Sequence, residues 1–112
     1  MKRVLLLLLL TLLPLFAGDS VIMKVEIKGA IGPASSAVLT QALNAARKQR
    51  AEALLIELDT PGGLSTSMRE MIQAITNSAV PVITYVAPRG ARAASAGTYL
   101  LYASHVAAMS PG

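Results

Sequence analysis

The sequence lacks cysteine and tryptophan, and its 112 residues include a single histidine, His105. Without cysteine the chain can form neither disulfide bonds nor thiolate zinc sites. One histidine also argues against a histidine-rich metal centre. We therefore expect neither a bound metal nor a cofactor.

Charged residues are few, at 14% of the chain, and the formal net charge is +4. Removing Lys2 and Arg3, which belong to an N-terminal targeting pattern, lowers the charge from +4 to +2. The basic cluster at residues 47–50 falls at the end of a helical pattern, where cations complement the exposed carbonyl groups. Nucleic-acid binding thus gains little support, and we expect no nucleic-acid partner.

The N-terminus has the pattern of an export signal, with basic Lys2 and Arg3 followed by an apolar run over residues 4–17. The run is shorter than the roughly 20 residues that a membrane-spanning helix requires. We predict an export signal over residues 1–17, cleaved after Ala17 or Gly18, with retention as a short anchor as the alternative. The protein is then exported to the periplasm or another extracytoplasmic space.

Residues 18–112 show regular alternation of strand and helix patterns. Strands are predicted over 21–27, 53–58, 81–86 and 105–109, and helices over 33–50, from about 65–67 to 77, and over 93–103. The mostly apolar run at 53–58 is typical of a strand covered on both faces. Ser67 and Glu70 match a capping box, although Ser65 or Thr66 could equally cap that helix. The alternation predicts an α/β fold with a mainly parallel sheet and right-handed crossovers.

Two short motifs follow successive strands. Asp59-Thr60-Pro61-Gly62-Gly63 closes the second strand, and Ala94-Ser95-Ala96-Gly97 follows the third. Parallel strands place such segments together at their carboxyl ends. A serine hydroxyl facing backbone N–H groups of a Gly-Gly turn suggests acyl transfer, because fixed N–H groups stabilise the oxyanion. Each motif alone also has a structural interpretation, as a common turn and as a helix cap.

Four segments closely resemble the N-terminal protease domain of NfeD-type membrane-bound serine proteases. They are residues 25–29, Gly32-Pro33, Leu58-Asp59-Thr60-Pro61-Gly62-Gly63 and residues 85–99. The run Pro88-Arg89-Gly90-Ala91 before Ala93-Ala94-Ser95-Ala96-Gly97 is the most specific part. That family belongs to the ClpP and signal-peptide-peptidase class, which implies a crotonase-like fold. The pattern ends in the turn Ser110-Pro111-Gly112, and we expect residues 18–112 to be the N-terminal part of a longer protease domain.

The resemblance implies Ser95 as nucleophile and the N–H groups of Gly63 and Ala96 as oxyanion donors. Small residues beside them leave room for the substrate backbone; these are Gly62, Ala94 and Gly97. The family's general base is a lysine that would lie some forty residues after the serine, beyond residue 112. Within residues 1–112, Lys24, Lys28 and Lys48 are possible general bases for Ser95 only in principle. His105 is another candidate, but it is better interpreted as a structural histidine.

The expected function is a Ser/Lys serine endopeptidase that cleaves apolar segments of membrane-associated, stomatin-like proteins. A non-catalytic assembly module for a membrane partner and a crotonase-type acyl-CoA enzyme are the alternatives, and the export signal argues against the second. Self-association as a dimer or higher oligomer is expected. Arg89 and Arg92 are interpreted as groove-lining or solvated loop residues, and Tyr99 and Tyr102 as facing the sheet or a subunit contact.

Overall fold

The computed structural model describes residues 2–12 and 19–112. Its first element is the helix α1 (Lys2–Leu12), whose leucine side chains are exposed from Leu5 to Leu8. No helix in the described ranges is long and apolar enough to cross a membrane. The predicted cleavage region after Ala17 or Gly18 lies outside the described residues.

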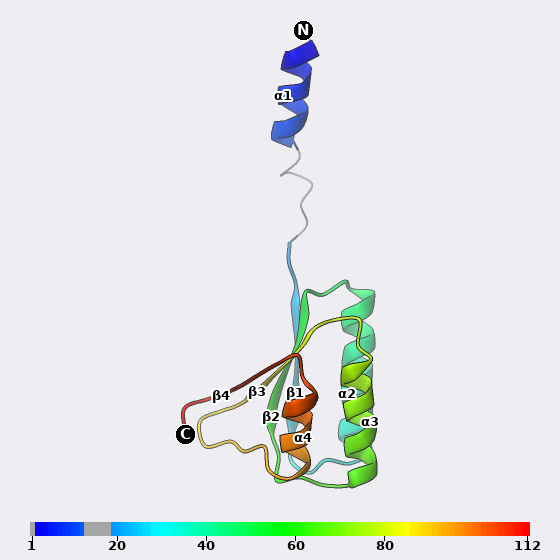
Figure 1. Cartoon of the computed structure of the whole chain (residues 1–112), viewed down its shortest axis with the longest axis vertical. Coiled ribbons are helices and arrows are strands. Elements are labelled where there is room, and N and C mark those ends of the chain that lie inside the picture. The colour runs from blue at the N-terminus through cyan, green and yellow to red at the C-terminus, as the bar shows by residue number, and fades with distance from the viewer. Residues whose placement is uncertain (1, 13–18) are drawn as a thin grey trace.

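Four strands and three helices follow α1 in strict alternation. They are β1 (Ile22–Lys28), α2 (Pro33–Lys48), β2 (Ala53–Asp59), α3 (Ser65–Thr76), β3 (Val82–Val86), α4 (Ala96–Ala103) and β4 (Val106–Met109). The strands form one parallel sheet in the order β1-β2-β3-β4. Figure 1 shows α2, α3 and α4 packed on the same side of this sheet. The α/β architecture predicted from the alternation is confirmed.

The core lies between the helices and one face of the sheet. From the central strand β2 it receives Leu54, Ile56 and Leu58, all buried. The helices supply apolar residues at helical spacing; the buried ones are Leu39, Leu43 and Ala46 from α2 and Met71 and Ile75 from α3. These positions follow from the periodicity of the sequence.

The prediction that residues 53–58 are covered on both faces is wrong for the described part of the chain. Leu55 and Glu57 are only partly buried, and they alternate with buried neighbours. The strands are adjacent in the order of the sequence, and all crossovers have the same handedness, so every helix between strands lies on the same face of the sheet. The other face has no described element over it.

The predicted capping box at Ser67 and Glu70 is also wrong. Helix α3 begins at Ser65 with Leu64 as its N-cap, so Ser67 already lies inside the first turn, where it is buried. The Glu70 carboxylate instead accepts a hydrogen bond from Ser36 Oγ on α2, at 3.1 Å. A contact between two helices, which no local pattern encodes, decides the role of Glu70.

Helix α4 begins at Ala96, three residues later than predicted. The reason is that Ala93 forms a parallel bridge with Thr60, and the N–H of Ala94 donates to Thr60 O at 3.1 Å. These residues extend the sheet and cannot join the helix. On the helix itself Tyr99 and Tyr102 are 57% and 84% exposed, so of the two expectations for them, facing the sheet is wrong and a subunit contact stays a prediction.

Candidate active site

The carboxyl edge of the sheet continues beyond the strands as three short extended segments. Ile31, after β1, forms a parallel bridge with Gly63, and Thr60, after β2, forms one with Ala93. The central segment, residues 60–63, therefore lies between the other two. The two motifs singled out in the sequence meet at this edge.

The Gly62-Gly63 turn has a backbone that other residues rarely adopt, with φ values of +110° and +159°. The N–H of Ile31 donates to Gly62 O at 2.8 Å, and Ile31 O accepts from the N–H of Leu64 at 2.9 Å. These bonds use the groups on either side of Gly63, as a parallel bridge requires. The N–H of Gly63 itself consequently points away from Ile31, toward the segment that carries Ser95.

Ser95 has a strained backbone, with φ 52° and ψ −114°, at the N-cap position of α4. Positive φ is uncommon outside glycine and marks positions that the surrounding structure holds in place. The side chain is exposed and makes no capping hydrogen bond. Within residues 2–12 and 19–112 the hydroxyl has no hydrogen-bond partner, so the interpretation of Ser95 as a helix cap fails.

Ser95 and Gly62 are in close contact. A Cβ atom placed on Gly62 would lie 2.9 Å from Ser95 Cβ and 3.3 Å from Ser95 Oγ. In the described part of the chain, no hydrogen bond is donated by the N–H groups of Gly63 and Ala96, which flank this contact. A hydroxyl next to two free N–H groups has the composition of a nucleophile with an oxyanion hole.

The small residues around Ser95 differ in their surroundings. Ala94 is partly exposed, whereas Gly97 is buried beneath the start of α4. A Cβ on Gly97 would lie 2.6 Å from Thr60 Cγ2. Gly97 thus allows α4 to pack onto Thr60.

No lysine of the described chain has the environment of a general base for Ser95. Lys24 on β1 forms an ion pair with Glu57 on β2, with 2.6 Å between Nζ and Oε2. The hydrogen bond and charge of Glu57 raise the pKa of Lys24 above its ordinary value. A lysine base requires the opposite shift. Lys28 and Lys48 are exposed at the ends of β1 and α2.

His105 occupies the opposite edge of the sheet. Its Nδ1 accepts a hydrogen bond from the N–H of Val82 at 3.0 Å, and its own backbone N–H donates to Val82 O. Val82 is paired with Leu54, so about six residues of β2, or roughly 20 Å, separate this point from Thr60. The interpretation of His105 as a structural residue agrees with this geometry.

Asp59 and Thr60, the two polar residues of the glycine-turn motif for which no role of their own was predicted, hold the segment before Ser95. Asp59 Oδ1 accepts from the N–H of Arg92 at 3.1 Å, and the N–H of Thr60 donates to Arg92 O at 2.7 Å. Their position immediately before Pro61-Gly62-Gly63 is the sequence feature that could have indicated this role. The Arg92 side chain is exposed, so this residue contributes through its backbone.

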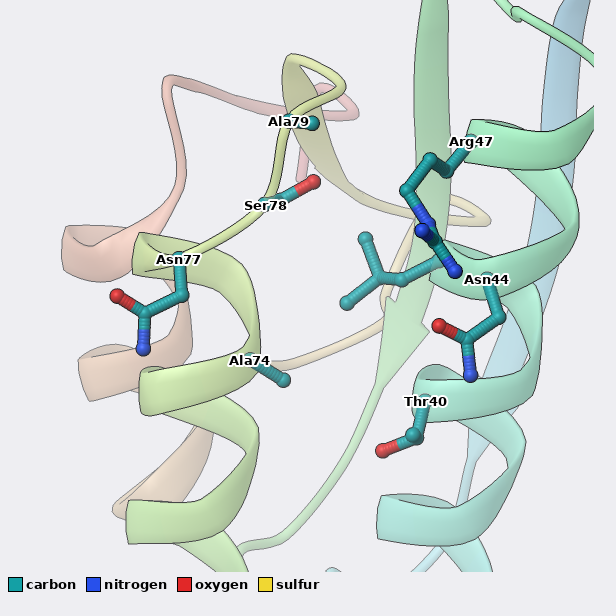
Figure 2. A pocket seen from close by; sticks show the side chains of 8 residues that line it. Thr40, Asn44, Arg47, Ala74, Asn77, Ser78 and Ala79 are labelled. Carbon is teal, nitrogen blue, oxygen red and sulfur yellow. The ribbon is translucent and has the colours of Figure 1, made fainter.

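A separate cleft of about 280 Å³ lies far from Ser95, between the carboxyl ends of α2 and α3. Figure 2 shows Thr40, Asn44 and Arg47 on one side and Ala74 and Asn77 on the other. The described residues contain no group of three or more His, Asp or Glu side chains that could hold a metal ion.

The fold is that of the ClpP-like proteins. A solved structure of the 1510-N membrane protease specific for a stomatin homolog from Pyrococcus horikoshii superposes with a TM-score of 0.80 at 43% identity, over 85% of this chain and 48% of that one. ClpP1 of Listeria monocytogenes, in a variant form, matches with a TM-score of 0.66 over 72% of this chain and 46% of that one. At 18% identity this second likeness shows the fold alone.

Residues 21–112 match the model of the NfeD1b N-terminal domain, and the chain belongs to this family. Membrane-bound protease PH1510 of Pyrococcus horikoshii is 41% identical over 114 residues, covering 100% of this chain and 26% of that protein. Membrane protein NfeD1b of Bacillus subtilis is 40% identical over 75 residues, covering 66% of this chain and 16% of that one. The chain spans about a quarter or less of these curated relatives.

Proposed function

We propose that this chain carries the nucleophile and oxyanion hole of a serine peptidase. The observation that supports the proposal best is the backbone of Ser95, held at φ 52° with its hydroxyl exposed and not used as a cap. A strained serine at a strand-to-helix turn presents its Oγ to substrate, as in other serine hydrolases.

In this mechanism Ser95 Oγ attacks the carbonyl carbon of a peptide bond while a base removes the hydroxyl proton. The N–H groups of Gly63 and Ala96 donate to the negative oxygen that forms. The base returns its proton to the leaving amine, and the amine departs from an acyl-serine. Water then attacks the ester, the base accepts a proton from it, and Ser95 regains its hydrogen as the carboxylic acid leaves.

We propose that the base is a lysine outside residues 1–112, which makes the enzyme a Ser/Lys peptidase. The lysines at hand are either paired or exposed at element ends, and burial among apolar groups is what lowers a lysine pKa enough for this role. Structures of the 1510-N protease include a serine-to-alanine variant and a lysine-to-alanine variant in complex with a substrate peptide.

The proposed substrates are apolar segments of stomatin-like, membrane-associated proteins. The related 1510-N protease is named as stomatin-specific and as membrane-bound. In the proposed groove Ala94 faces the substrate, and Gly62, without a side chain, leaves room for Ser95. Gly97, expected from the sequence to contact substrate, is instead buried against Thr60 and serves packing of α4. We further propose that the protein is exported, associates with the membrane and assembles into a homo-oligomer.

The test is hydrolysis of an apolar peptide by the full-length protein and its Ser95→Ala variant. We expect turnover to fall by about four orders of magnitude or more, as for other serine nucleophiles. Ser65→Ala changes an exposed serine two positions after the glycine turn, so it is the matched control and should retain full turnover. Unchanged hydrolysis by Ser95→Ala would refute the proposal, whereas an absence of hydrolysis by the unmodified full-length protein would favour a non-catalytic assembly module.

A further inference from the structure

Thr60 has a place in this site that the chemistry of nucleophile and donors does not explain. Its side chain is fully buried, at 0% exposure. The hydroxyl accepts a hydrogen bond from the N–H of Gly62 at 3.1 Å and donates one to Gly62 O at 3.3 Å. One side chain thus holds both polar groups of the residue before the proposed oxyanion donor.

Because the peptide bond is planar, this contact with Gly62 also determines the orientation of the Gly63 N–H. Gly62 O and the N–H of Gly63 belong to one trans peptide unit, so they point in opposite directions. Gly62 O is held by Thr60 Oγ1 and by the N–H of Ile31, on the side away from Ser95. Fixing that oxygen therefore fixes the direction of the Gly63 N–H.

Thr60 also connects the glycine turn to the serine segment. Its N–H donates to Arg92 O at 2.7 Å, and its carbonyl oxygen accepts from the N–H of Ala94 at 3.1 Å. The Cγ2 methyl group lies under Gly97, on the first turn of the helix that follows Ser95. The Thr60 hydroxyl thus holds the glycine turn, its backbone holds the segment before Ser95, and its methyl group packs under the first turn of α4.

We infer that Thr60 is a positioning residue, whose hydroxyl aims the Gly63 N–H at the oxyanion while its backbone holds the segment that carries Ser95. This inference rests on the proposed peptidase function. Oxyanion donors act because they are oriented before the reaction, so a donor that is free to turn loses most of its effect. Glycine at both positions of the turn makes such an anchor necessary, because glycine restricts its own backbone least.

Three variants of the full-length protein separate the two halves of the side chain. Thr60→Val keeps the shape and loses the hydroxyl, Thr60→Ser keeps the hydroxyl and loses the methyl group, and Thr60→Ala loses both. We expect Thr60→Val to lower kcat by about 10-fold or more with KM nearly unchanged, less than the roughly 100- to 1000-fold loss of a whole donor. Thr60→Ser should keep kcat within about threefold, and Thr60→Ala should resemble Thr60→Val.

A merely structural role would not give this pattern. With a purely structural role, the loss of total activity in the three variants would follow the loss of thermal stability, and kcat per folded molecule would be unchanged. If Thr60→Val retains wild-type kcat while Ser95→Ala is inactive, the inference is wrong and the peptidase proposal stands. If Ser95→Ala is fully active, the peptidase proposal itself fails.

Amide hydrogen exchange in the unmodified protein tests the same contact without depending on the folding of a variant. The N–H of Gly62, bonded to Thr60 Oγ1, should exchange at least about tenfold more slowly than the N–H of Gly63, because exchange requires the bond to open. Equal rates at the two glycines would overturn the inference.

Discussion

The Cα atom of Gly62 faces the side chain of Ser95 so closely that an added methyl group would lie 2.9 Å from Ser95 Cβ. Thirty-three positions in sequence (95 − 62) separate the two residues, and the parallel extension of the sheet beyond β2 brings them together. Ser95 can thus occupy its position only because residue 62 has no side chain.

Gly62→Ala should therefore impair the site in two ways. The methyl group would displace Ser95, and the φ of +110° would be strained for alanine, at a cost of about 1–3 kcal/mol in the free energy of unfolding. We expect peptide hydrolysis to fall by about 100-fold or more, since an ångström of misplacement has that effect.

Gly90→Ala is the matched control for this variant. Gly90 also has positive φ, +86°, but no atom of the described residues lies within 4 Å of the place that a Cβ would occupy. It should lose stability with hydrolysis within about twofold of wild type. Equal losses of hydrolysis in both variants would contradict a specific role of the Gly62–Ser95 contact.

The contact between Gly97 and Thr60 predicts a rescue. A Cβ on Gly97 would lie 2.6 Å from Thr60 Cγ2, so Gly97→Ala should destabilise the protein by about 1–3 kcal/mol through overpacking. Thr60→Ser removes that methyl group and makes room for the new one. In urea unfolding, the double variant should be more stable than the sum of the single effects by about 0.5 kcal/mol or more. Additive effects would show that the two positions do not compete for space.

The Lys24–Glu57 pair predicts a pH dependence of stability and not of catalysis. Glu57 raises the pKa of Lys24 from its ordinary 10.5, so the pair stabilises the folded state fully below that value and loses its effect as pH rises through the folded-state pKa. The difference in unfolding midpoint between wild type and Lys24→Gln should thus be constant from neutral pH to about 9 and shrink above 10.5.

Since Lys24 is exposed, added salt should also reduce this difference. Lys28→Gln, which removes a neighbouring lysine without an ion pair in the described structure, is the control. Hydrolysis should be normal in both variants. Loss of turnover in Lys24→Gln alone would identify Lys24 as the base and contradict the proposal of a lysine outside this chain.

His105 is expected to affect folding and not hydrolysis. Its Nδ1 accepts from the N–H of Val82 at the far edge of the sheet, so His105→Ala leaves that N–H without its partner. We expect a loss of about 1 kcal/mol in the free energy of unfolding. Turnover per folded molecule should match the wild type when measured beside thermal denaturation. A selective loss of turnover would instead support a Ser/His pair.

Local pattern was sufficient for most of the fold. The helix at Pro33–Lys48 and the strand at Ala53–Asp59 follow from apolar spacing, proline placement and length. Their alternation was enough to predict the parallel sheet. The same alternation placed the glycine turn and Ser95 at one edge, so the residues of the candidate site could be named from the sequence.

Contacts between distant segments decided the remainder. The sequence by itself determined which elements form, because helix and strand periods are local properties of the chain. Only the tertiary structure decided that Ala93 joins the sheet, that Glu70 binds Ser36, and that Thr60 holds Gly62. Such partners are chosen by packing in three dimensions, and hydrogen-bonding groups take whichever neighbour the packed fold brings to them.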